Sequence, residues 1–241
     1  MQVVSDTVRE QLRSRFEERL RDPVEARIYL KPGSGRLILP TGMGCPTCED
    51  TRLLLEEVAA QAAGQLSIEV IDITQGVVTE DVLDVPLVTL ARAGDPHRVR
   101  FLGLPSGFEF GMLVDAIEKL SAGDSGLAAD SVGSLSDVSE PIEIMVFATP
   151  TCRYCPSAVG LATGLAVASP EITAVTVSAN EFPRLSQAFG VQGVPRTVVN
   201  RRGAFVGAVP EPDFVRAVLQ IAGALPEEAD QPVEEGASTA L

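Results

Sequence analysis

Histidine is nearly missing from this chain of 241 residues, which contains only His97. A lone imidazole leaves almost no room for histidine-based metal sites or for the Ser–His and Cys–His pairs of nucleophilic catalysis. His97 follows a Gly-Asp-Pro turn sequence, so we expect a solvated loop residue. No G-x-G-x-x-G pattern follows a predicted strand, which predicts no nicotinamide or flavin site.

Basic charge and long apolar runs are also scarce. Lys and Arg total 19 against 33 Asp and Glu, which gives a formal net charge of −14. A surface of this sign repels phosphate backbones, so we expect no nucleic-acid partner. No apolar stretch reaches the roughly 18 residues of a membrane-spanning helix. Residues 1–21 are dense in charge and lack the apolar core of a signal peptide, so we expect no membrane partner and a cytoplasmic location.

Cysteines are few but ordered. All four lie in two C-x-x-C pairs, at residues 45–48 and 152–155, and in a cytosolic chain such pairs are usually redox-active or metal-binding. Each pair follows a strand-like run and opens a predicted helix, whose N-terminal amides and dipole stabilise a thiolate. We therefore expect Cys45 and Cys152 to be nucleophiles. Cys48 and Cys155 lie one helical turn later, where they resolve a mixed disulfide.

The two pairs belong to an internal duplication. The offset between corresponding cysteines is 107 residues in both cases, and each half continues with a Val-Pro pair that begins an apolar run, Val85-Pro86 and Val194-Pro195. The strand signal Ile142–Phe147 precedes the second C-x-x-C pair. The same offset places its counterpart at Arg36–Leu39, although Arg27–Leu30 also has strand character, so one of the two runs is an insertion.

The hydrophobic and charged fractions, 45% and 22%, are those of a globular protein. An amphipathic helix is predicted over 7–21, capped by Thr7 and Glu10 and buried through Val8, Leu12, Phe16 and Leu20. Further helices are predicted after Cys48 to about Gly64 and over 108–120, 157–168, 184–189 and 213–224. Further strands are predicted over 67–73, 87–91, 99–102, 172–177, 196–200 and 204–209.

This order predicts an α/β protein of two tandem domains, each with a mixed central sheet of four or five strands flanked by helices. We expect an N-terminal domain over 1–122 and a linker over 123–140, in which residues 127–135 form a weak helix. The C-terminal domain is expected over 141–225, followed by a disordered acidic tail over 226–241.

The chain resembles the glutaredoxin-like protein disulfide oxidoreductases over roughly residues 5–224. The resemblance rests on Thr149–Pro156 with Val194-Pro195 in the second half, and on Asp22–Val24 and Phe101–Phe110 in the first. It implies two fused thioredoxin folds that exchange dithiols and disulfides with protein substrates. It also implies cis peptides at Val85-Pro86 and Val194-Pro195, where the valine backbones pair with an extended substrate segment. No cofactor is expected to be bound, and electrons come from a partner, such as a flavin-dependent thioredoxin reductase.

Neighbouring residues tune the two sites. Pro46 suits a first helical turn, and Arg153 places a cation beside the second pair. Tyr154 is either a substrate-facing aromatic or a residue without a special role. Thioredoxins carry a buried acid six positions before the first cysteine, where this chain has Leu39 and Val146. The proton acceptor of the resolving cysteine is therefore unassigned, with the strand-end acids Glu143 and Asp72 as weak candidates.

Three alternatives stay open at this point. The first is a dedicated electron relay to a peroxiredoxin. The second is a non-catalytic metal-binding or interaction module, although 103 residues separate the two pairs, far more than the roughly 15–20 of a zinc ribbon. The third is an iron–sulfur cluster bridged with glutathione, which the retained second cysteines disfavour. We predict no metal site and expect the second C-x-x-C pair to be the more active.

Overall fold

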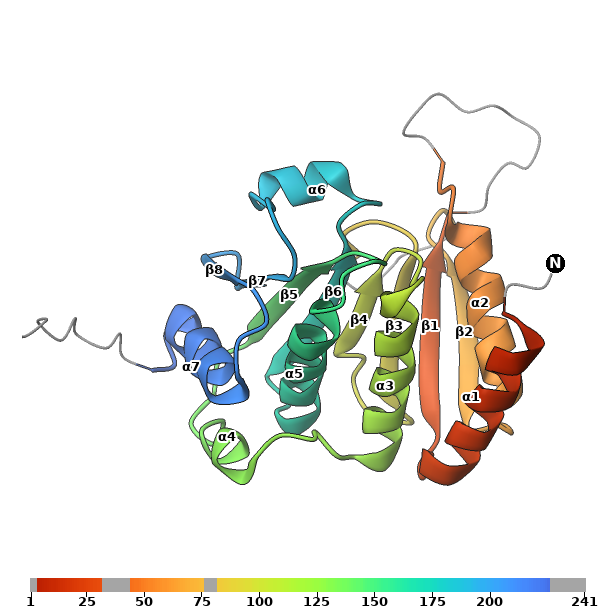
Figure 1. Ribbon diagram of the computed structural model, residues 1–241, viewed down its shortest axis with the longest axis horizontal. Coiled ribbons are helices and arrows are strands. Elements are labelled where there is room, and N and C mark those ends of the chain that lie inside the picture. The colour runs from red at the N-terminus through yellow and green to blue at the C-terminus, as the bar shows by residue number, and fades with distance from the viewer. Residues whose placement is uncertain (1–3, 32–43, 76–81, 226–241) are drawn as a thin grey trace, which may run out of the picture.

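The computed structural model describes residues 4–31, 44–75 and 82–225 (Figure 1). The first half contains α1 (Asp6–Arg19), β1 (Val24–Leu30), α2 (Cys48–Gln61), β2 (Leu66–Asp72), β3 (Leu87–Arg92), β4 (Val99–Leu102) and α3 (Phe108–Ala122). A short helix, α4 (Ala129–Gly133), follows in the predicted linker. The second half contains β5 (Ile142–Ala148), α5 (Cys155–Ala168), β6 (Ile172–Ser178), α6 (Pro183–Ala188), β7 (Arg196–Val199), β8 (Gly203–Val206) and α7 (Glu211–Ala222).

The strands form one sheet in the order β2-β1-β3-β4-β6-β5-β7-β8. In the first half β1 is parallel to β2 and antiparallel to β3, and in the second half β5 is parallel to β6 and antiparallel to β7. This repeat confirms two mixed thioredoxin-like sheets. The sequence did not predict that they join: β4 pairs in parallel with β6, with Val99 opposite Ala174.

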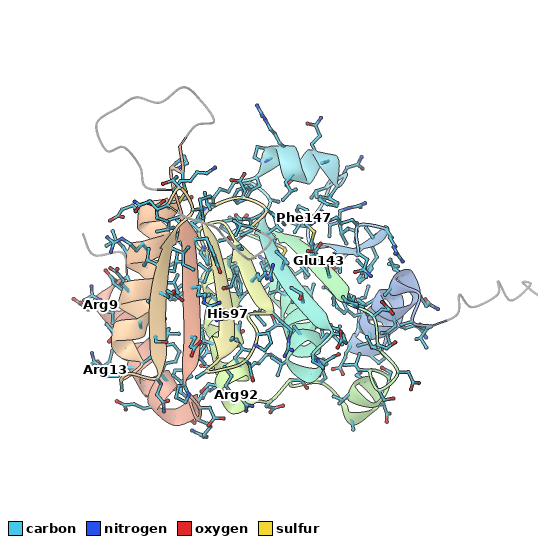
Figure 2. The ribbon with its side chains drawn as sticks, turned by 180° about the vertical axis from the view of Figure 1, so that it is seen from behind. Arg9, Arg13, Arg92, His97, Glu143 and Phe147 are labelled. Atoms are coloured by element: carbon cyan, nitrogen blue, oxygen red, sulfur yellow. A yellow bond between two sulfur atoms is a disulfide. The ribbon has the colours of Figure 1, made fainter. Side chains whose placement is uncertain are left out.

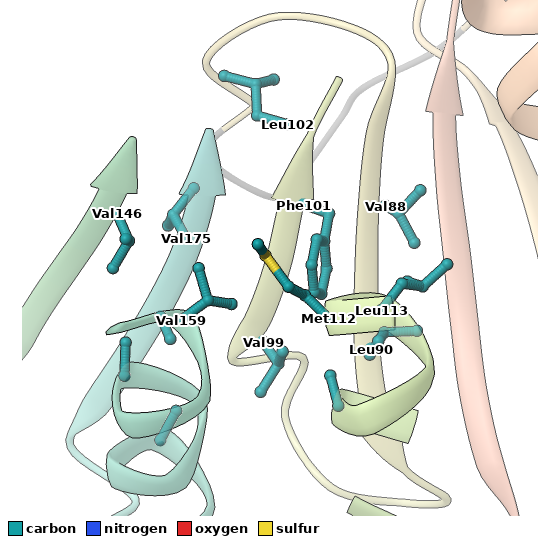
Figure 3. Packing of buried hydrophobic residues seen from close by; sticks show 14 of the residues in the cluster. Val88, Leu90, Val99, Phe101, Leu102, Met112, Leu113, Val146, Val159 and Val175 are labelled. Atoms are coloured by element: carbon teal, nitrogen blue, oxygen red, sulfur yellow. The ribbon is translucent and has the colours of Figure 1, made fainter. Parts of the chain in front are cut away.

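The hydrophobic core is continuous across that junction. Figure 3 shows Phe101, Met112 and Leu113 of the first half beside Val159 and Val175 of the second, and all five are buried. Helices α3 and α5 pack against each other over one face of the sheet (Figure 1). Because central parallel strands are covered on both faces, β5 is an almost unbroken apolar run.

Counterpart strands identify the insertion in the first half. The pairing pattern makes β1 the equivalent of β5, so the continuation from the N-terminal helix is the correct alternative. Fourteen residues separate Leu30 from Cys45, whereas three separate Ala148 from Cys152. The extra residues therefore lie just before the first C-x-x-C pair. The run Arg36–Leu39 itself lies outside the described residues, as do the acidic tail and most of the segment between β2 and Val82.

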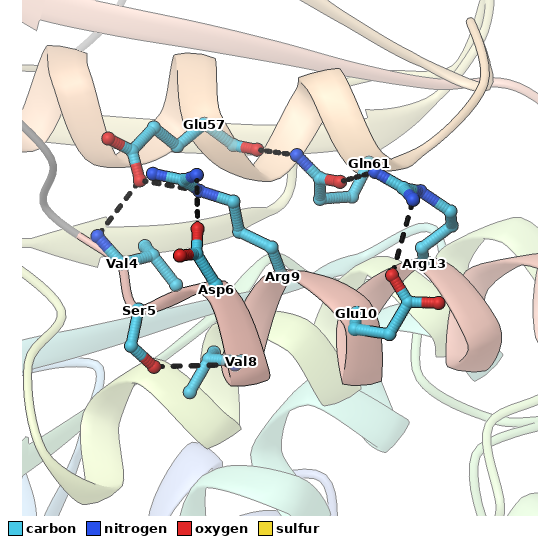
Figure 4. Close-up of polar contacts among 9 residues, drawn as sticks. All are labelled: Val4, Ser5, Asp6, Val8, Arg9, Glu10, Arg13, Glu57 and Gln61. Carbon is cyan, nitrogen blue, oxygen red and sulfur yellow. Dashed lines mark hydrogen bonds and ion pairs between the residues drawn. The ribbon is translucent and has the colours of Figure 1, made fainter.

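Helix α1 begins one residue earlier than predicted, and this moves its cap. The N-cap is Ser5, whose Oγ accepts from the Val8 N–H at 3.4 Å, so the predicted Thr7–Glu10 capping box is wrong. Glu10 instead pairs with Arg13 at 3.2 Å. The predicted apolar face is confirmed, since Leu12, Phe16 and Leu20 are buried. Arg9 and Arg13 connect α1 to Glu57 and Gln61 of α2 (Figure 4).

The expectation for His97 is also wrong. His97 is 7% exposed and lies just before β4, which pairs with β3 (Figure 2). Its Nδ1 lies 3.0 Å from the Thr89 hydroxyl, and its Nε2 lies 3.8 Å from Glu25 Oε2. The side chain is a packed structural residue of the first half.

None of the helices in the described ranges combines the length and the apolar content needed to traverse a bilayer.

Two candidate redox sites

Both C-x-x-C pairs lie at one edge of the sheet. Strand β1 runs parallel to β4 through the antiparallel β3, and β4, β6 and β5 are mutually parallel. The carboxyl ends of β1 and β5 therefore point to the same edge, and each is followed by one cysteine pair. The duplication thus places two equivalent motifs at the same end of the sheet, with β3, β4 and β6 between the strands that precede them. Open α/β sheets carry their functional groups at these strand ends.

The second pair has the geometry of a reactive dithiol. Cys152 and Cys155 form a disulfide with a Cα–Cα distance of 5.5 Å, and Cys155 is the first residue of α5. Cys155 is fully buried, whereas Cys152 is partly exposed. The Cys155 backbone N–H donates to Cys152 Sγ at 3.1 Å. A donor aimed at the accessible sulfur stabilises its thiolate, which favours Cys152 as the nucleophile and Cys155 as the resolving residue.

The first pair repeats the disulfide, the helix start and the burial of the second cysteine. Cys45 and Cys48 form a disulfide with a Cα–Cα distance of 5.4 Å, and α2 begins at Cys48. Cys48 is 4% exposed and Cys45 is more accessible. The accessibility of the sulfurs thus favours the same order of attack in both pairs. Among the described residues, no cluster of three or more metal-ligating side chains is present.

The Val-Pro loops adopt the conformation that the resemblance implied. The Val85-Pro86 and Val194-Pro195 peptide bonds are both cis. Each proline leads directly into a strand that pairs with the strand before a cysteine motif, β3 with β1 and β7 with β5. The loops are thus held at the same sheet edge as the sulfurs.

A cleft lies beside each loop. The one next to the second site measures about 630 Å³ and is lined by Thr149, Val194 and residues of α6 and its flanking loops. The one at the first site measures about 590 Å³ and is lined by Pro46, Thr47 and Val85 from the first fold and by residues 181–185 from the second. The wall of the first cleft therefore belongs partly to the other half of the chain.

The predicted tuning residues differ in their positions. Pro46 lines the first cleft. Arg153 and Tyr154 are exposed beside Cys152, and the Tyr154 ring, 65% accessible, is available for contact with a bound protein.

The two weak candidates for a proton acceptor do not fit. Glu143 lies at the start of β5, at the opposite end of the strand from Cys152, and pairs with Arg201 at 3.2 Å (Figure 2). Asp72 caps the turn after β2, where its bonds from Thr74 hold the pKa of its carboxyl below the usual range. Both carboxylates serve local structure.

Sequence reasoning overlooked Glu109, in the first turn of α3. Its residue is 2% exposed, and burial raises the pKa of its carboxyl to about 7 against the hydrogen bonds from Ser178 and Ser106. Its Oε1 has no hydrogen-bond partner among the described residues. The preceding Phe108 N–H donates to the Pro150 carbonyl at 2.9 Å, which sets this helix start against the loop of the second site. A lone acid on an apolar helix face was the available signal.

Replacing Glu109 with glutamine is expected to stabilise the protein at alkaline pH. Folding raises the pKa of this carboxyl from 4.5 to about 7. The stability that the protonated carboxyl allows is therefore fully present only below its unfolded pKa, and it is lost as pH rises through 7. The free energy of unfolding of the variant, measured relative to that of the wild type, should therefore increase by roughly 2–3 kcal/mol from about pH 5 to about pH 8. Urea midpoints at both pH values measure this gain. The exposed control Glu140→Gln should show none, and an equal result for both variants would contradict the assignment.

Comparisons with known proteins agree with this geometry. Residues 142–220, the second fold, match the family described as a thioredoxin domain. The alkyl hydroperoxide reductase AhpF of Pseudomonas aeruginosa is 29% identical over 115 residues, which is 48% of this chain and 22% of that protein. The matched segment thus spans about a fifth of that relative's length.

Solved structures extend the match to both halves. A protein disulfide oxidoreductase from Aeropyrum pernix aligns over 93% of this chain and 95% of its own, with 29% identity and a TM-score of 0.75. The N-terminal domain of AhpF from Enterococcus faecalis shares the fold, with a TM-score of 0.74 over 89% of this chain and 99% of its own at 20% identity. The chain is therefore a tandem thioredoxin-fold protein with one C-x-x-C disulfide in each fold, similar over nearly its whole length to the protein disulfide oxidoreductase from Aeropyrum pernix.

Proposed function

We propose that the chain exchanges dithiols and disulfides with protein substrates, mainly through Cys152 and Cys155. The observation that carries this proposal is the Cys155 N–H directed at the accessible Cys152 sulfur, 3.1 Å away. A cis Val194-Pro195 loop and an open cleft accompany the pair. A stabilised thiolate next to a groove for an extended chain is what attack on a protein disulfide requires.

In the reducing direction, the Cys152 thiolate attacks one sulfur of the substrate disulfide. A mixed disulfide forms, and the other substrate sulfur leaves as a thiolate that takes a proton from water. Cys155 then loses its proton and attacks Cys152 Sγ, so the internal disulfide closes and the second substrate thiolate leaves. Two electrons pass to the substrate, and the reverse sequence oxidises a dithiol.

We assign the proton of Cys155 to Glu109. A carboxylate with a pKa of about 7 accepts a proton readily near neutral pH, and this one is buried in the helix start that contacts the second site's loop. Its unpartnered Oε1 leaves an acceptor free for that proton among the described residues.

In this proposal Val85, Pro86, Val194 and Pro195 bind the substrate. An extended segment that carries the disulfide would pair with the valine backbone beside each cleft, in the manner of an added strand. The two clefts that these loops border support the assignment. Arg153 and Tyr154 would contact the substrate at the rim of the second site.

The oxidised pairs must be reduced again by a partner. We propose a flavin-dependent thioredoxin reductase as the donor, with Cys45 and Cys48 able to relay electrons to the second site. A cytoplasmic location fits dithiols that cycle, since thiols there are kept reduced.

A second candidate function is a dedicated relay to a peroxiredoxin. It is favoured by one observation, the sequence similarity to the alkyl hydroperoxide reductase AhpF over 48% of this chain. A relay would turn over general protein disulfides poorly and one peroxidase quickly.

Insulin-disulfide reduction with dithiothreitol tests the proposed function. We expect precipitation of the insulin B chain well above the rate with dithiothreitol alone, because the poised thiolate attacks faster than a free thiol. No excess rate, together with fast peroxide reduction when a peroxiredoxin, a thioredoxin reductase and NADPH are supplied, would favour the relay. A fresh preparation that contains zinc and yields fewer than two reducible disulfides would instead favour the non-catalytic module.

A further inference from the structure

Glu181 lies in the second fold but binds the first redox site. It follows β6 and precedes α6, and its Oε1 accepts a hydrogen bond from the Thr47 hydroxyl, inside the first C-x-x-C motif. Its Oε2 accepts from the Leu104 backbone N–H at 2.8 Å. Both oxygens of this carboxylate are thus held by groups of the other fold.

The Glu181 carboxylate is tightly packed at the interface between the two folds. Gly103 has a φ of +108°, and a Cβ placed there would lie 2.8 Å from Glu181 Oε2 and 2.8 Å from Ser178 Cβ. Only a residue without a side chain allows the loop before α3 to approach so near. The position of the carboxylate is therefore fixed by packing.

The Glu181 carboxylate and a Cys45 thiolate would both place a negative charge at the N-terminus of α2. Thr47 is the N-cap of α2, yet its side chain makes no cap hydrogen bond and turns instead to Glu181. The carboxylate therefore lies at the positive end of α2, where a thiolate of the first site is stabilised. Two negative charges at one helix end repel each other, so the carboxylate opposes thiolate formation at Cys45.

The second site has a different neighbourhood. Its residue at the position of Thr47 is Tyr154, which is 65% exposed, and Arg153 is exposed beside it. The charged residues that line the first cleft are Lys31, Asp84, Glu181 and Arg184. Glu49 and Asp50 lie in the first turn of α2. Glu109 interacts electrostatically with Glu181. Of these groups, Glu181 is the one that accepts a hydrogen bond from within the cysteine motif.

We propose that Glu181 is a cross-fold positioning residue that disfavours the Cys45 thiolate and thereby makes the first pair the stronger reductant of the two. A destabilised thiolate destabilises the dithiol, so the first pair gives up its electrons more readily. The inference deepens the proposed function and rests on it, since it ranks the two sites and points electron flow from the first pair to the second.

The test is the Glu181→Gln variant of the full chain, compared with Glu181→Asp and Glu49→Gln. Reduced protein is alkylated with iodoacetamide over a range of pH, and the Cys45 and Cys152 peptides are quantified separately by mass spectrometry. We expect the Cys45 thiol pKa to fall by about one in Glu181→Gln, with Cys152 unchanged. At about pH 8, the equilibrium of the first pair with dithiothreitol should move several-fold toward the dithiol.

The companion variants separate charge from structure. Glu181→Asp keeps the carboxylate and should leave the Cys45 pKa near the wild-type value. Glu49→Gln removes a charge from the same helix turn, but Glu49 is paired with Arg52, so a smaller change is expected. An unchanged Cys45 pKa in Glu181→Gln, or an equal change at Cys152, would overturn the proposal. Because these readouts need no substrate, failure of the insulin assay would count against the proposed function alone.

Discussion

Replacing Cys152 with serine is expected to abolish nearly all insulin-disulfide reduction. A serine hydroxyl neither ionises near neutral pH nor forms a disulfide, so the second site loses both its nucleophile and its redox couple. We expect a loss of roughly tenfold or more in the turbidity assay, because the carboxylate of Glu181 lowers the thiolate fraction at Cys45 of the first site.

The matched control for this variant is Cys45→Ser, which removes the equivalent sulfur of the first fold. It should retain a substantial part of the activity with dithiothreitol as donor, since dithiothreitol reduces the second pair directly. Cys155→Ser should accumulate a mixed disulfide with insulin, because the resolving thiol is absent. Equal losses in Cys152→Ser and Cys45→Ser would contradict the ranking of the two sites.

Gly107→Ala is expected to be the most destabilising substitution at the interface of the two folds. Gly107 has φ +55° and ψ −125°, a conformation that residues with a Cβ avoid. A Cβ there would lie 2.4 Å from the Pro150 carbonyl oxygen, in the loop before Cys152. The strain and the displaced loop should together cost about 3 kcal/mol or more, which lowers the melting temperature by roughly 6–12 °C.

A second alanine in the same helix provides the control. Gly111 lies inside α3, and a Cβ added there would meet none of the described atoms within 4 Å, so Gly111→Ala should stabilise the protein by about 0.5–1 kcal/mol. Calorimetry on both variants should give changes of opposite sign. A neutral Gly107→Ala would show that the helix start does not hold the second site's loop.

Local sequence features predicted much of the fold. The apolar alternation and the Val-Pro runs identified β3, β5, β6 and β7 within a residue or two, because these strands are buried and their pattern is strong. The C-x-x-C spacing alone indicated that each cysteine acts with its neighbour in the same motif, and the disulfides lie within the motifs. The cis peptides required the family resemblance, since an isolated Val-Pro pair is trans far more often.

Several tertiary contacts could not be predicted from the sequence, because the residues that form them are distant in the chain. Thr47 and Glu181 are separated by 134 residues, and no periodicity connects them. The junction of β4 with β6, the burial of His97 and the burial of Glu109 depend in the same way on how the two halves pack. The constant cysteine offset misplaced the first strand for a local reason, since the insertion lies between that strand and its cysteines.

The most direct test of the central claim is the reactivity of Cys152 in the reduced wild-type protein. At about pH 6, we expect iodoacetamide to label Cys152 at least roughly fivefold faster than free cysteine, while the buried Cys155 is labelled slowly. Peptide mapping by mass spectrometry distinguishes the two sulfurs. If Cys152 reacted no faster than free cysteine, the amide donor at its sulfur would not be stabilising a thiolate, and the proposed exchange through Cys152 would be wrong.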